Sequence, residues 1–122
     1  MSIYKSQDDR NVLYQDAIAA WGWEAQVDMA VEELAECTVA IQKLFKRDFS
    51  AKRYADLASE VADVTIMMEE IRYILDTGNT PEGVDENQSF SQLVAEQVLY
   101  KLNRTRTRID MAQEIQNRAG QE

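Results

Sequence analysis

The chain has 122 residues, which is enough for one domain with a single core. It contains no histidine, and its single cysteine is Cys37. This composition excludes Ser-His-Asp and Cys-His catalysis, His-ligated zinc and an intramolecular disulfide. The net charge is −9, from 22 acidic and 13 basic residues, so we expect no binding to duplex nucleic acid through its phosphates.

Without histidine, a bound metal must be held by oxygen ligands, which favours Mg²⁺ or Mn²⁺ and leaves Ca²⁺ open. No apolar run approaches the roughly 20 residues that a membrane span needs. The first residues, MSIYKSQDDR, lack the apolar stretch of a secretory signal. We therefore expect a cytoplasmic protein with no membrane partner.

Helical periodicity predicts three helices in the first two thirds of the chain, and we find no strand-like alternation. The first is expected over residues 9–21, ended by Gly22 in a left-handed conformation. The second is expected over residues 24–46, and the third over residues 53–76. The segment Thr77-Gly78-Asn79-Thr80-Pro81 ends the third helix.

A fourth helix is expected after a polar loop that runs through Asn87. Ser89 followed by Gln92 resembles a capping box that opens this helix. Four helices with short connections indicate an all-α fold, an antiparallel bundle of about four helices in a single domain spanning residues 1–122.

Two pairs of carboxylates stand three residues apart in the second and third predicted helices. They are Glu33 with Glu36, and Glu60 with Asp63, and this spacing puts both members of a pair on one side of a helix. At about 100° per residue, Glu33 and Glu60 fall among apolar neighbours. Other acidic residues of these helices point to polar faces: Asp28, Glu32 and Glu69.

A carboxylate among core residues is costly unless it is paired or bound to a metal. Four carboxylates converging between two helices would repel one another and raise some pKa values, and a divalent ion would relieve that repulsion. Two alternatives stay open: a solvated acidic face, and pairing with the cations Lys101, Arg104 or Arg108 of the last helix.

The segment WGWEAQVDMAVEELAECTVAIQKL, followed by LASEVADVTIMMEEI, resembles the MazG-like all-α nucleoside triphosphate pyrophosphohydrolases. That superfamily is marked by ExxE followed by ExxD, which match Glu33-x-x-Glu36 and Glu60-x-x-Asp63. The resemblance covers about residues 17–75, with weaker support from KLNRTRTRI at 101–109.

The resemblance implies a metal-dependent hydrolase that cleaves a nucleoside triphosphate (NTP or dNTP) between the α and β phosphates to the monophosphate and pyrophosphate. Its role would be nucleotide pool control or sanitation, with the preferred base left open. The metal would be Mg²⁺, with Mn²⁺ as a substitute, and its ligands would be Glu33, Glu36, Glu60 and Asp63. The general base would be Glu36, although the sequence barely distinguishes it from Glu33 in this role. A homo-dimer or homo-tetramer is also implied.

Substrate contacts are expected from Lys101, Arg104 and Arg108 to the phosphates, from Asn103 to sugar or base, and from Trp21, Trp23 and Gln26 to the base. For the cations, simple salt bridges to the acidic surface are an equal alternative. For the tryptophans, core packing is at least as compatible with the sequence.

Three rival interpretations remain. A non-catalytic acidic helical protein that binds a basic partner would carry its carboxylates on exposed faces. A carboxylate-bridged di-iron bundle needs Glu-x-x-His motifs, and the absence of histidine nearly excludes it. An enzyme of the same fold with a different pyrophosphate-bearing substrate stays open.

Overall fold

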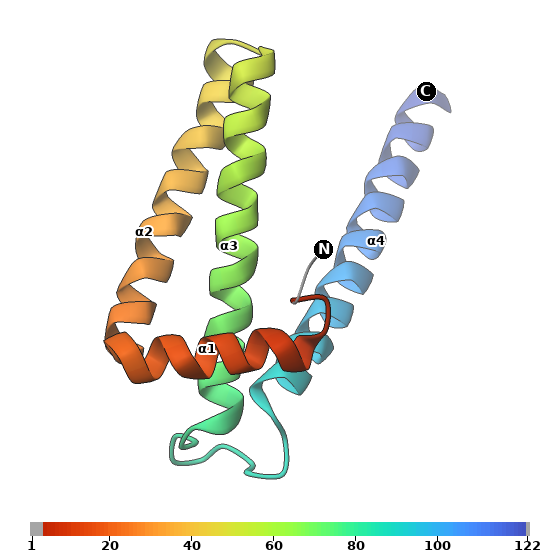
Figure 1. The fold of residues 1–122 in the computed structure, drawn as a ribbon. Helices are drawn as coiled ribbons and strands as arrows, with labels where there is room; N and C mark the ends of the chain where they lie inside the picture. Colours follow the sequence, from red (N-terminus) through yellow and green to blue (C-terminus); the bar gives the residue numbers. More distant parts are fainter. Residues whose placement is uncertain (1–3, 122) are drawn as a thin grey trace. The chain divides into compact units, whose positions relative to one another are not determined.

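The computed structural model describes residues 4–121, and in this range it is all-α, without a strand (Figure 1). The elements are α1 (Gln7–Trp21), α2 (Trp23–Gln42), the short π-helix η1 (Lys43–Arg47), α3 (Ala51–Thr77) and α4 (Phe90–Gln121). The predicted all-α class with four main helices is confirmed. The chain divides into two compact units, residues 1–79 and residues 80–122. The four-helix bundle and the single domain stay predictions.

A single residue, Gly22, joins α1 to α2. Its φ of 87° and ψ of 149° lie in a region that residues with a Cβ rarely adopt. Its N–H donates to the carbonyl of Ile18 at 2.8 Å and closes the last turn of α1. The predicted helix end at Gly22 is confirmed, with positive φ but with an extended rather than helical ψ.

In the first unit, α2 and α3 lie side by side and run antiparallel (Figure 1). Ala30 and Ala40 of α2 are buried in this interface, and Leu44 of η1 is buried at its far end. The Ser50 side chain accepts a hydrogen bond from the N–H of Arg53 at 3.2 Å and so caps the start of α3. These contacts fix which turns of α2 and α3 face one another.

The expected second helix ends in a π-helical turn. The N–H of Asp48 donates to the carbonyl of Lys43 at 3.1 Å, five residues earlier in the chain. Such a turn rotates the residues after it relative to a continuous α-helix. Lys43, the first residue of this turn, therefore lies where α2 stops being regular.

Helix α1 lies across the end of the hairpin at which α2 begins (Figure 1). Tyr14 is buried there, with its ring 6.3 Å from that of Tyr73 on α3. Arg10 forms an ion pair with Glu69 (Nε to Oε1, 2.6 Å), and Gln7 donates to the same oxygen at 2.7 Å. Glu69 is thus half-buried against α1 instead of standing on the polar face that the periodicity of one helix predicts.

The second unit consists of a polar loop and α4. Gln92 N–H donates to Ser89 Oγ at 3.1 Å, and Ser89 N–H donates to Gln92 Oε1 at 2.8 Å. This reciprocal pair is the predicted capping box, and it starts α4 at the next residue, Phe90.

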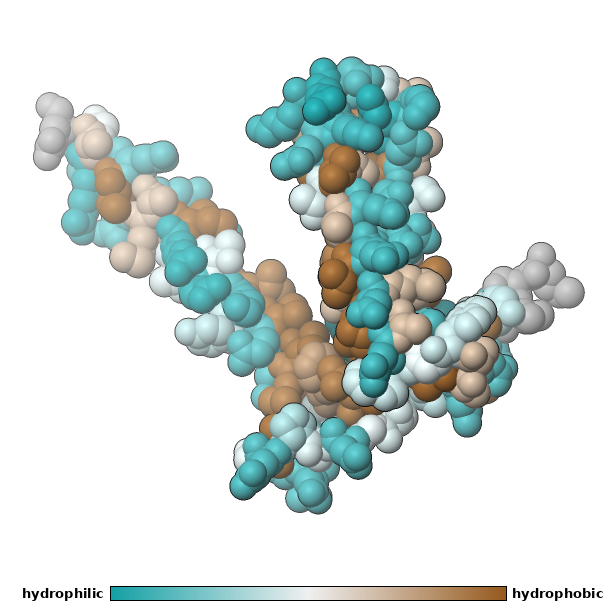
Figure 2. Space-filling view, turned by 90° about the vertical axis from the view of Figure 1, so that its left-hand side faces the viewer, coloured by the Kyte–Doolittle hydropathy of each residue, from teal (hydrophilic) through white to brown (hydrophobic). Residues whose placement is uncertain are grey.

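Apolar side chains are also found at the surface, among hydrophilic ones (Figure 2). Across residues 4–121, no helix combines the length and the apolar character that crossing a bilayer requires.

Candidate metal centre

Three carboxylates meet between α2 and α3. Glu33 and Glu36 lie one turn apart on α2, Glu60 lies on α3, and one carboxylate oxygen from each falls within 4.8 Å of the others. The two helices are antiparallel neighbours, so the two acidic motifs face each other. The structure therefore brings together three of the four predicted metal ligands.

Asp63, the fourth predicted ligand, lies one turn after Glu60 and is half-buried. It is not part of the trio of oxygens within 4.8 Å. After burial and the charge of Glu36, the charge of Asp63 is the next cause that raises the pKa of Glu33. Asp63 thus belongs to the same negative cluster, at its edge.

The pKa values of Glu33 and Glu60 are both raised. Burial is the main cause for each, followed by the charge of Glu36 and then the charges of the remaining carboxylates. One oxygen of each residue, Oε2, is buried and has no hydrogen-bond partner among residues 4–121. A buried carboxylate oxygen without a partner costs free energy, and a bound cation would offset that cost.

The cluster fits a small, hard divalent cation. All its donors are carboxylate oxygens, which Mg²⁺ and Mn²⁺ prefer over nitrogen or sulfur. Within residues 4–79, no lysine or arginine forms an ion pair with Glu33, Glu36, Glu60 or Asp63. Glu36 is exposed, so the cluster is open to solvent on its side.

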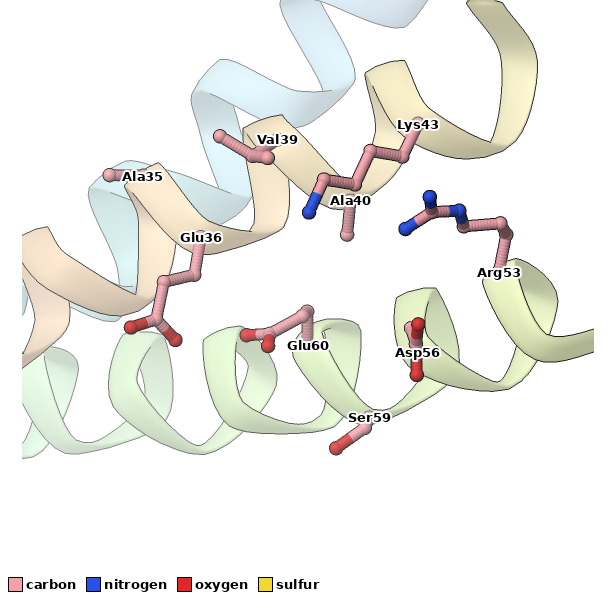
Figure 3. A pocket seen from close by; sticks show the side chains of 9 residues that line it. All are labelled: Ala35, Glu36, Val39, Ala40, Lys43, Arg53, Asp56, Ser59 and Glu60. Atoms are coloured by element: carbon pink, nitrogen blue, oxygen red, sulfur yellow. The ribbon is translucent and has the colours of Figure 1, made fainter. Parts of the chain in front are cut away.

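A groove of about 450 Å³ extends from Glu36 and Glu60 toward η1 (Figure 3). Its other lining residues come from both walls of the hairpin: Ala35, Val39, Ala40, Lys43, Arg53, Asp56 and Ser59. Sequence reasoning did not select Lys43 or Arg53. Their spacing in the sequence could have identified them, because Lys43 lies seven residues after Glu36 and Arg53 lies seven residues before Glu60. Seven residues are about two helical turns, which puts each cation on the same face as its carboxylate.

Gln26, a predicted base contact, is buried against Glu70 of α3, and only 4% and 3% of these residues are exposed. With the Gln26 amide oriented to donate, its nitrogen lies 2.8 Å and 3.1 Å from the two oxygens of Glu70. Burial raises the pKa of Glu70. Contact between Gln26 and a nucleobase would require this pair to open, and sequence reasoning did not find Glu70.

Trp21 and Trp23 flank Gly22 and are 67% and 54% exposed. Within residues 4–121, more than half of each of these residues is therefore open to solvent, and neither packs in a core. Trp23 stands ten residues before Glu33, about 15 Å along α2. Their role as base contacts stays a prediction.

The remaining predicted contacts lie on α4. Asn103, Arg104 and Arg108 line a shallow depression in the surface of this helix, together with Tyr100 and Thr107. The Arg104 guanidinium lies 5.8 Å from the centre of the Tyr100 ring. Lys101 is exposed. Phosphate binding by these residues stays a prediction.

Comparison of the chain with protein-family models, with curated proteins and with solved structures yields no match. The function is therefore inferred from the side chains that the fold brings together.

Proposed function

We propose that this protein is a metal-dependent nucleoside triphosphate pyrophosphohydrolase that cleaves between the α and β phosphates. The observation that carries the proposal is the convergence of Glu33, Glu36 and Glu60, with oxygens within 4.8 Å of one another and a buried, unpartnered oxygen on two of them. The order of the two acidic motifs, which resembles that of the MazG-like enzymes, supplies the reaction.

A triphosphate whose α-phosphate reaches the carboxylate cluster would meet Glu36 and Glu60, both of its own sign of charge. Like charges a few Å apart repel, most strongly where water is partly excluded. Binding of such a substrate therefore needs a cation between the protein and the phosphates. Hydrolysis by this site should depend strictly on a divalent metal.

Glu33, Glu36, Glu60 and Asp63 would hold Mg²⁺, or Mn²⁺ in its place. When bound, the metal neutralises charge and polarises phosphate oxygens. Glu33 and Glu60 are half-buried and suit the role of fixed ligands. Glu36 is exposed and lines the groove, so its carboxylate is open to both a metal and a water molecule.

Glu36 is accordingly the residue to which we assign the general base. It takes a proton from a water molecule whose oxygen bonds to the α-phosphorus. The bond from that phosphorus to the bridging oxygen breaks, and the electron pair leaves with pyrophosphate. The nucleoside monophosphate keeps the water oxygen.

The proposal extends to deoxynucleotide pool control or sanitation in the cytoplasm and to a homo-dimer or homo-tetramer. Exposed apolar side chains on α2 that do not line the groove favour self-association: Val31, Leu34 and Ile41. Burying such side chains against a second copy would stabilise an oligomer.

The experiment is a panel of common NTPs and dNTPs with Mg²⁺ or Mn²⁺, in which monophosphate, diphosphate, pyrophosphate and phosphate are scored separately. Monophosphate with pyrophosphate is expected, lost with chelator and in Glu60→Gln but retained in Glu32→Gln, a matched exposed control on α2. Absence of both turnover and Mn²⁺ binding would leave the acidic interaction protein as the better description.

A further inference from the structure

The groove that begins at Glu36 and Glu60 contains two cations, one from each wall. Lys43 is the first residue of η1, and Arg53 is the third residue of α3 (Figure 3). The chain has only 13 lysines and arginines against 22 acidic residues. Two cations facing one groove from two segments therefore give this end a charge opposite to that of the cluster.

Both cations have hydrogen-bond donors to offer. Across the described part of the chain, the Lys43 ammonium forms no hydrogen bond or ion pair with another residue, although the residue is half-buried. Arg53 donates from Nε to Asp48 Oδ1 at 3.2 Å, and its side chain is 28% exposed. That ion pair holds the guanidinium in place while its two terminal amino groups face the groove (Figure 3).

The cations stand at a suitable distance from the carboxylates for a chain of phosphates. Lys43 follows Glu36 by seven residues, and Arg53 precedes Glu60 by seven, or about 10 Å along each helix. Helical side chains lean toward the N-terminus of their helix, so the side chain of Lys43 leans back toward Glu36. Figure 3 shows its ammonium group directed along the groove in this way.

Two further features keep this end of the groove receptive to anions. Arg53 lies in the first turn of α3, where the helix dipole adds partial positive charge. Asp56, the carboxylate nearest to Arg53 along α3 among the lining residues, forms an ion pair with Lys52 at 3.1 Å, which compensates its charge. The groove therefore changes from negative at Glu36 and Glu60 to positive at Lys43 and Arg53.

We propose that Lys43 and Arg53 form a subsite for the terminal phosphates of the substrate and for the pyrophosphate that leaves. The orientation depends on the proposed function, which places the α-phosphate at the carboxylate cluster. The ligand class is a polyphosphate of at least two phosphoryl groups, while a monophosphate leaves this subsite empty. The subsite lies within the α2–α3 hairpin and is separate from the cations of α4.

The test is calorimetric binding of inorganic tripolyphosphate to the full chain in the presence of Mg²⁺, which requires no turnover. Loss of a charge-assisted hydrogen bond is expected to weaken binding about tenfold in Lys43→Met and again in Arg53→Gln. Lys46→Met and Arg47→Gln are matched controls, because both residues lie in η1 but do not line the groove. They should change binding less than about twofold. Arg53→Lys, which keeps a cation beside Asp48, replaces Arg53→Gln if the latter does not fold.

Mn²⁺ binding to the same variants separates the two claims. Tripolyphosphate binding that weakens in the two groove variants while Mn²⁺ binding is unchanged supports the subsite. If wild type binds Mn²⁺ but not tripolyphosphate, or if the η1 controls weaken binding as much as Lys43→Met does, the subsite is wrong and the metal site stands. If wild type binds no Mn²⁺, the proposed function fails, while tripolyphosphate binding that depends on Lys43 would still support the anion subsite.

Discussion

Glu36 of α2 and Glu60 of α3 bring carboxylate oxygens within 4.8 Å of each other across the interface of two antiparallel helices. After burial, the charge of Glu36 is the largest cause that raises the pKa of Glu60. The packing of the helices therefore holds the two carboxylates close together, although their negative charges repel each other. A proton or a cation between the helices relieves that repulsion.

One consequence is a characteristic pH dependence of stability without metal. A carboxyl whose pKa is raised by folding binds its proton more tightly in the folded chain than in the unfolded chain. The stability contributed by Glu33 and Glu60 is thus complete below the ordinary pKa of glutamate and is lost as pH rises through their raised values. In EDTA, Glu60→Gln should be more stable than wild type at pH 8, and the difference should shrink toward pH 4. Urea unfolding at both pH values measures it, and a Glu60→Gln variant less stable than wild type at pH 8 would contradict it.

Divalent metal should stabilise the folded chain through the same residues. A ligand that binds only the folded state raises the melting temperature in proportion to the logarithm of its free concentration once that exceeds Kd. We expect this response to Mg²⁺ or Mn²⁺ in wild type and in Glu32→Gln, and its loss in Glu60→Gln. An equal response in Glu60→Gln would place the metal elsewhere, and calorimetric melting across a metal titration decides between the two results.

The buried pair of Gln26 and Glu70 should matter for stability whatever the protein binds. Gln26→Ala removes the amide that donates to Glu70 and leaves a buried carboxyl without that partner. We expect a loss of about 1–3 kcal/mol in the free energy of unfolding. Gln42→Ala, an exposed change near the end of the same helix, should stay within about 0.5 kcal/mol of wild type. Equal effects in the two variants would show that the pair contributes nothing specific.

Gly22 should resist substitution for a backbone reason alone. A Cβ at this position would meet no atom within 4 Å, but the φ of 87° is strained for any L-residue with a side chain. Gly22→Ala is therefore expected to cost about 1–3 kcal/mol. Gly120→Ala, at a helical position that is equally open, should be neutral or stabilising by up to about 1 kcal/mol. Thermal melting of both variants tests the contrast, and a neutral Gly22→Ala would show that the turn relaxes.

The helices and their ends were largely predictable from the sequence, because local signals determine them. Gly22 and the pair of Ser89 and Gln92 act within a few residues of the helix ends that they fix. The facing of Glu36 and Glu60 was also accessible, since each motif lies on one face of a predicted helix. The two motifs form one cluster because the antiparallel packing of α2 and α3 places them at the same level of the helix pair.

Contacts between segments far apart in the chain were not predictable from such local signals. Glu69 meets Arg10 of α1, and Glu70 meets Gln26 of α2. These consecutive residues lie in one turn of α3, so α1 and α2 cover two different faces of that turn, which the periodicity of α3 alone does not reveal. Lys43 lines the groove at the point where α2 gives way to a π-helical turn. Side-chain packing between distant segments, rather than local propensity, decides these positions.

The most direct test of the central claim is turnover of the preferred nucleoside triphosphate in ¹⁸O-labelled water with Mg²⁺, with the products analysed by mass spectrometry. We predict one ¹⁸O atom in the nucleoside monophosphate, none in pyrophosphate, and no products when Mg²⁺ is chelated. Label in pyrophosphate, release of a nucleoside diphosphate, or turnover that persists without metal would contradict metal-dependent attack at the α-phosphorus.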